Sequence, residues 1–175
     1  MREVSDAFLL NIAEVTAALV GLFLVGIFFF VETGMHRRLR DSEAVAAYFR
    51  SGTRITLIVF SVPLLLPLTL VAMEEIWSYV LFAALSGLLL WANLDSVRRF
   101  RAARDAMGAP PFAVIESVGT AAVFVIVALP WILGGIDPSR EDLTWAIILA
   151  FGTGFLAVST LVLSTFDLAG SEAGD

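Results

Sequence analysis

The chain has 175 residues, of which 59% are hydrophobic, and its mean hydropathy is +0.90. These values exclude a water-soluble domain, because a chain this small cannot bury so much apolar surface in a core of its own. The formal net charge is −6, and arginine clusters beside such apolar segments indicate contact with the lipid bilayer rather than with nucleic acid.

Long apolar blocks follow one another along the chain and predict an all-α bundle of five transmembrane helices in one domain, residues 1–175. The expected spans are residues 7–31, 55–73, 76–94, 112–134 and 143–166. Each is long enough for a hydrocarbon core of about 30 Å. The first span contains Glu14 and lacks a small-residue cleavage site, so we expect a retained helix and not a signal peptide.

Arginine is concentrated in two segments, residues 32–54 and 95–111, which we expect to be loops. Nine of the 11 arginines lie there, whereas the other two, Arg2 and Arg140, share the opposite side with acidic residues. These acidic residues are Glu74, Glu75, Asp137, Glu141 and Asp142. Because arginine-rich short loops stay in the cytoplasm, this pattern predicts an outside N-terminus, a cytoplasmic C-terminus and a plasma-membrane location.

Both arginine-rich loops are expected to contain helical segments that lie on the lipid headgroups. In the first of them, a short helix capped by Asp41 or Ser42 is expected to end at Gly52. Arginine attracts anionic lipid, and the candidate headgroup-binding residues are Arg37, Arg38, Arg40, Arg98, Arg99, Arg101 and Arg104.

Glu14 lies about 7 Å to the outer side of the midplane of the first span. An ionised carboxylate facing lipid at that depth is costly, so Glu14 is expected to face protein or water. Two hypotheses stay open: Glu14 binds a proton or cation with Asn11 beside it, or a protonated Glu14 bonds to a neighbouring helix. In the same span, the small residues Ala13, Ala17 and Gly21 predict close packing within the chain or between protomers.

Polar residues in the last two spans provide weaker candidates. Thr153, Thr160 and Ser164 form a hydroxyl row that suits a pore lining, although such hydroxyls also bond to their own helix, which we favour. Glu116 lies about 10 Å to the cytoplasmic side of the centre of its span. There we expect a structural ion pair with Arg54.

The chain contains no cysteine and no lysine, and His36 is its one histidine. Thiolate, Schiff-base and multi-histidine metal or haem chemistry is therefore excluded within one chain. Since we find no hydrolytic triad or phosphate-binding loop, we expect neither an enzyme nor a cofactor or metal. Exclusive use of arginine, with abundant alanine, valine, leucine and glycine, suggests a GC-rich prokaryotic genome.

The leading hypothesis is a homo-oligomeric channel or permeation protein for a small ion, because five helices enclose at most a narrow pathway. The main alternative is a non-transporting subunit or regulator whose arginine-rich cytoplasmic face binds a partner protein or anionic lipid. A third hypothesis, an enzyme acting on lipid, depends on Asn93, Asp95 and Glu116 lying together near the arginines.

Overall fold

The computed structural model describes residues 4–32, 43–107 and 110–170, where the chain is helical apart from short turns. The helices are α1 (Asp6–Glu32), α3 (Glu43–Ala72), α4 (Glu75–Met107), α5 (Pro110–Gly134) and α6 (Arg140–Gly170). All five are long and apolar enough to cross a membrane. The predicted all-α bundle is thus confirmed, and its five apolar helices indicate a multi-pass membrane protein.

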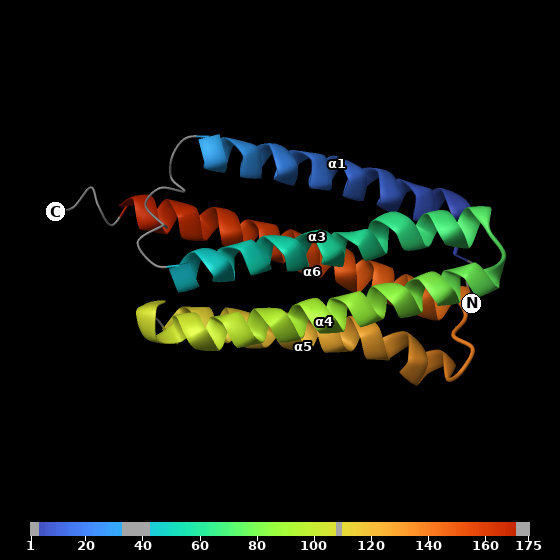
Figure 1. Ribbon diagram of the computed structural model, residues 1–175. Coiled ribbons are helices and arrows are strands. Elements are labelled where there is room, and N and C mark those ends of the chain that lie inside the picture. The colour runs from blue at the N-terminus through green and yellow to red at the C-terminus, as the bar shows by residue number, and fades with distance from the viewer. Residues whose placement is uncertain (1–3, 33–42, 108–109, 171–175) are drawn as a thin grey trace.

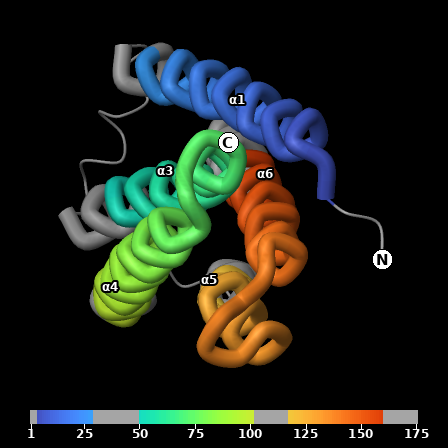
Figure 2. Tube along the Cα trace, turned by 90° about the vertical axis from the view of Figure 1, so that its right-hand side faces the viewer, coloured from blue at the N-terminus to red at the C-terminus, as the bar shows by residue number. Residues whose placement is uncertain are grey.

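The five helices lie side by side along one axis (Figure 1), and the start of α1 and the end of α6 are at opposite ends of the bundle. Helix α3 is central and packs against α1, α4 and α6, whereas α5 packs against α6 and α4. The end-on view in Figure 2 shows α1 on the rim, across α3 and α6 from α4 and α5. Much of the surface of α1 is therefore not covered by its own chain.

Two helices extend farther than the sequence predicted. The helical segments expected in loops 32–54 and 95–111 are not separate from the spans, because residues 43–54 and 95–107 are continuous parts of α3 and α4. The predicted helix end at Gly52 is wrong, because Ser51 and Thr56 are buried here and the Thr56 hydroxyl donates to the Gly52 carbonyl at 2.9 Å. Packing of this kind outweighs the low helix propensity of one glycine, about 1 kcal/mol.

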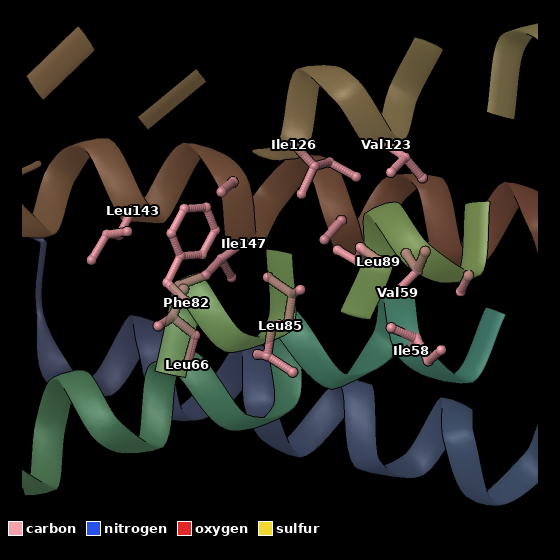
Figure 3. Packing of buried hydrophobic residues seen from close by; sticks show 14 of the residues in the cluster. Ile58, Val59, Leu66, Phe82, Leu85, Leu89, Val123, Ile126, Leu143 and Ile147 are labelled. Carbon is pink, nitrogen blue, oxygen red and sulfur yellow. The ribbon is translucent and has the colours of Figure 1, made fainter. Parts of the chain in front are cut away.

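The core lies between α3, α4, α5 and α6. Figure 3 shows large apolar side chains from these helices packed together, including Val59, Leu66, Phe82, Leu85, Leu89, Val123, Ile126, Leu143 and Ile147. Helix α1 contributes Leu9 to this cluster, and Leu9 is fully buried. Four helices thus form a well-packed unit to which α1 is attached along one face.

The turn between α5 and α6 is closed by glycine and by a helix cap. Gly135 has a φ of 67°, a left-handed conformation that glycine adopts without strain. Its amide donates to the Trp131 carbonyl at 3.0 Å, which ends α5. Ser139 and Asp142 then exchange backbone-to-side-chain hydrogen bonds at the start of α6, as in a capping box.

Candidate functional site

Apart from Glu14, the charged side chains that the structure describes lie toward the two ends of the bundle. One end, called the acidic end here, carries Asp6, Glu74, Glu75, Asp137, Glu141 and Asp142 together with Arg140. The other, called the arginine end, carries Arg50, Arg54, Arg98, Arg99 and Arg101 together with Asp95. The acidic end is on the right in Figure 1. Residues 33–42, which include His36, Arg37, Arg38 and Arg40, lie outside the described residues.

At the acidic end an ion pair joins the first turns of two helices. Arg140 of α6 donates to the carboxylate of Asp6 in α1. The sequence placed Arg140 on the same side as several acidic residues, but Asp6 was not identified as its partner. No local pattern could have revealed this pair, because its members are 134 residues apart.

Glu14 and Asn11 are both exposed on α1. The opposite face of this helix carries its buried residues Leu9, Ala13, Thr16 and Phe23, and α3 is the helix against which α1 packs. Among the described residues, Glu14 has neither a hydrogen bond nor an ion pair. Glu14 therefore points away from its own bundle, about 12 Å along α1 from Asp6.

The small residues of α1 are divided between these two faces. Ala13 is 4% exposed and faces the bundle, whereas Ala17 and Gly21 are exposed. The outward face follows alternating three- and four-residue steps through Asn11, Glu14, Ala18, Gly21 and Val25, all of them exposed. We call these five residues the outer face of α1. Sequence reasoning identified three of them and missed Ala18 and Val25, although the spacing was visible.

The hydroxyl row of α6 is only partly described. Thr153 is half-buried, and the side chains of Thr160 and Ser164 lie outside the described residues. Elsewhere in α6, Thr144 and Ser159 donate to carbonyls four residues earlier, at 2.8 and 2.9 Å. These two hydroxyls are engaged within their own helix, as serine and threonine often are in membrane helices.

At the arginine end, the carboxylate of Asp95 in α4 forms ion pairs with two guanidinium groups. Arg99 Nε donates to Asp95 Oδ2 at 2.8 Å, and Arg54 Nη1 of α3 lies 3.7 Å from the same oxygen. Arg54 also lies over the ring of Trp91, with 6.0 Å between its Cζ and the ring centroid. The partner predicted for Arg54 was Glu116, whose side chain lies outside the described residues. The partner that the structure shows is Asp95, and its four-residue spacing from Arg99 was readable in the sequence.

Polar groups inside the bundle do not join into a row. Thr120 of α5 donates to Asn93 Oδ1 of α4 at 3.4 Å, while Ser78 and Ser86 are buried on α4 without a hydrogen-bond partner. Phe82 and Leu89 are buried on the same side of α4 between these polar positions. The part of the interior that the structure describes therefore offers an ion no continuous polar path.

No group of acidic, histidine or cysteine side chains suited to a metal ion occurs within residues 4–32, 43–107 and 110–170. Comparisons with protein-family models, with curated proteins and with solved structures found no match. The outer face of α1 and the arginine end are therefore the candidate functional surfaces of the described chain.

Proposed function

We propose that the protein assembles as a homo-oligomer in the membrane and lets a small cation pass between its protomers. The observation that carries this proposal is the exposed Glu14 on the outer face of α1. A carboxylate in an apolar span is costly against lipid and marks an ion pathway when it faces water or protein. A negatively charged carboxylate at this position favours a cation or a proton over an anion.

The position of Glu14 supports a pathway between protomers. The core of α3–α6 is filled by large apolar side chains, so the monomer has no wide interior passage in its described part. On the outer face of α1, Ala18 and Gly21 allow the backbone of another helix to come close. Repeating this contact around a symmetry axis would place Glu14 and Asn11 from several copies at one depth.

The charge distribution supports an orientation in the membrane. Arginine-rich termini of membrane helices stay in the cytoplasm, so the arginine end is assigned to the cytoplasm and the start of α1 to the outside. In this arrangement Glu14 lies in the outer half of the bilayer, and the end of α6 is cytoplasmic. The membrane is then the plasma membrane of a prokaryotic cell.

A second candidate function is a non-transporting subunit or regulator. Arg50, Arg54, Arg98 and Arg101 are all exposed where α3 and α4 approach the arginine end. Such a surface suits a soluble protein partner or anionic lipid. It differs from the channel proposal in requiring no flux through the purified protein.

Cation flux into liposomes that contain the purified protein tests the channel. Glu14→Gln is expected to lower the flux by roughly tenfold or more, because a charge-assisted interaction with the ion is lost. The matched control is Glu74→Gln, which removes the same charge from an exposed position in the turn between α3 and α4 and is expected to keep the wild-type flux.

An unchanged flux in Glu14→Gln would reject Glu14 as an ion site. If the wild-type protein gives no flux but keeps a stoichiometric partner through purification, the second function is favoured.

A further inference from the structure

The surface between α3 and α4 at the arginine end has the chemistry of a phosphate site. Arg54 on α3 is half-exposed, with 51% of its side chain accessible. Its distance to Asp95, 3.7 Å, is too long for a hydrogen bond. In the described part of the chain, Arg54 makes no hydrogen bond, so its guanidinium N–H groups remain available to an oxygen ligand.

Asp95 does not neutralise this surface. Its shortest contact is the 2.8 Å hydrogen bond from Arg99 on the same helix, and its side chain is 24% exposed. Arg50 lies one turn beyond Arg54 on α3, and Arg98 lies two turns beyond Trp91 on α4; both are exposed. Among the side chains that the structure describes here, these two arginines, Arg54 and Arg99 lie with one carboxylate, so positive charge is in excess between two adjacent helices.

Trp91 places this surface at the depth of the lipid headgroups. Trp91 is 56% exposed, and its ring lies under the guanidinium of Arg54. Toward the middle of the bundle, Leu88 is exposed on the same side of α4. Tryptophan favours the membrane–water interface, so we expect the arginines at the depth of the lipid phosphates and Leu88 at the depth of the acyl chains.

We propose that Arg54, which lies over the ring of Trp91, binds the phosphate of an anionic glycerophospholipid in the leaflet at the arginine end, together with Arg50 and Arg98. The planar guanidinium matches the phosphate oxygens in a paired geometry. A zwitterionic lipid is disfavoured, because its cationic headgroup would lie among surplus arginines while Asp95 is already bonded to Arg99. This site serves either function proposed above and does not depend on cation conduction.

Native mass spectrometry of the delipidated full chain in a neutral detergent tests the site. Titration with dioleoylphosphatidylglycerol is expected to show saturable binding that is at least several-fold tighter than that of dioleoylphosphatidylcholine. Arg54→Gln is expected to weaken binding of the anionic lipid by roughly tenfold, because a charge-assisted contact is lost. Arg54→Lys, which keeps the charge but not the fork of donors, is expected to fall between Arg54→Gln and the wild type.

The control variant is Arg140→Gln, which makes the same change of net charge at the acidic end and is expected to bind as the wild type does. Arg98→Gln is a second test, because Arg98 has no described ion pair whose loss would disturb the fold. The proposal is overturned if Arg54→Gln and Arg140→Gln weaken binding equally, or if the zwitterionic lipid binds as tightly. It is also overturned if millimolar inorganic phosphate displaces the lipid, since the site would then be one for free anions.

The result of the lipid-binding test does not depend on the result of the flux assay. Lipid binding that is lost in Arg54→Gln but kept in Glu14→Gln supports the lipid site, whatever the flux of either variant.

Discussion

Gly154 of α6 lies directly against the aromatic ring of Phe60 in α3. A Cβ atom at this position would be 2.7 Å from Cε1 and 2.9 Å from Cδ1 and Cζ of that ring. Phe60 is 1% exposed, so it has little room to move. We expect Gly154→Ala to lower the free energy of unfolding by about 1–3 kcal/mol through overpacking. The measurement is the thermal unfolding midpoint of the purified protein in detergent.

Gly152, two positions before Gly154 in the same helix, provides the matched control. A Cβ added there meets nothing within 4 Å, and alanine is favoured over glycine in a helix by up to about 1 kcal/mol. Gly152→Ala should therefore keep or raise the midpoint. Equal midpoints for the two variants would show that α3 and α6 do not approach each other as closely as the structure describes.

Single residues differ in how far the sequence could define their roles. The depth of Glu14 was readable from its distance along an apolar span, but the direction in which it points was not. Lipid is as apolar as a protein core, so hydropathy does not distinguish the inner face of α1 from its outer face. The Asp6–Arg140 pair and the contact of Gly154 with Phe60 depend on which helices are neighbours, which no local pattern contains.

The helices themselves were largely predictable, because a span must be apolar over a length fixed by the bilayer. The limits of α3 and α4 at the arginine end were less predictable. A short helix was predicted in residues 43–52, but Gly52 was expected to separate it from the span, whereas α3 runs through Gly52 without a break. Buried Ser51 and Thr56 show the cause: this end of α3 is packed, and a packed segment tolerates a glycine.

The proposed pathway between protomers requires that the outer face of α1 packs against another copy of the chain. The chain has no native cysteine, so single-cysteine variants report contacts without background. If α1 packs against α1 of another copy, Ala18→Cys and Gly21→Cys should form disulfide-linked dimers on oxidation in native membranes. Such a bond requires Cα atoms about 4.4–6.8 Å apart, which small residues at a helix contact allow.

Two further positions make this experiment specific. Ala13→Cys faces the bundle and should stay monomeric. Val125→Cys tests random collision, because Val125 is 48% exposed but lies on α5. Cross-linking at Val125 equal to that at Ala18 would remove the support for a defined α1 contact, and absence of dimers at both outer positions would assign this face to lipid or to a different protein.

The whole molecule is organised by the separation of charge between its ends. The turns between α3 and α4 and between α5 and α6 lie at the acidic end, whereas Arg50, Arg54, Arg98, Arg99 and Arg101 lie at the opposite end. An odd number of helices runs between the acidic end and the arginine end. The start of α1 and the end of α6 therefore lie at opposite ends of the bundle (Figure 1). The proposed cytoplasmic location of the arginine end follows from this separation together with the positive-inside rule.

Labelling of single cysteines from one side of a sealed membrane tests this layout. Ile136→Cys, at a position that is 99% exposed in the turn between α5 and α6, should react with an impermeant maleimide on intact cells stripped of any outer wall. Glu74→Cys should react in the same way, because it lies in the other turn of the acidic end. Arg101→Cys, exposed at the arginine end, should react only after the membrane is opened.

Reaction of Arg101→Cys on sealed cells with protection of the other two would reverse the orientation, and it would move Glu14 to the cytoplasmic half of the bilayer. Reaction of all three on sealed cells would mean that α4 does not cross the membrane, because Glu74 and Arg101 lie at its two ends.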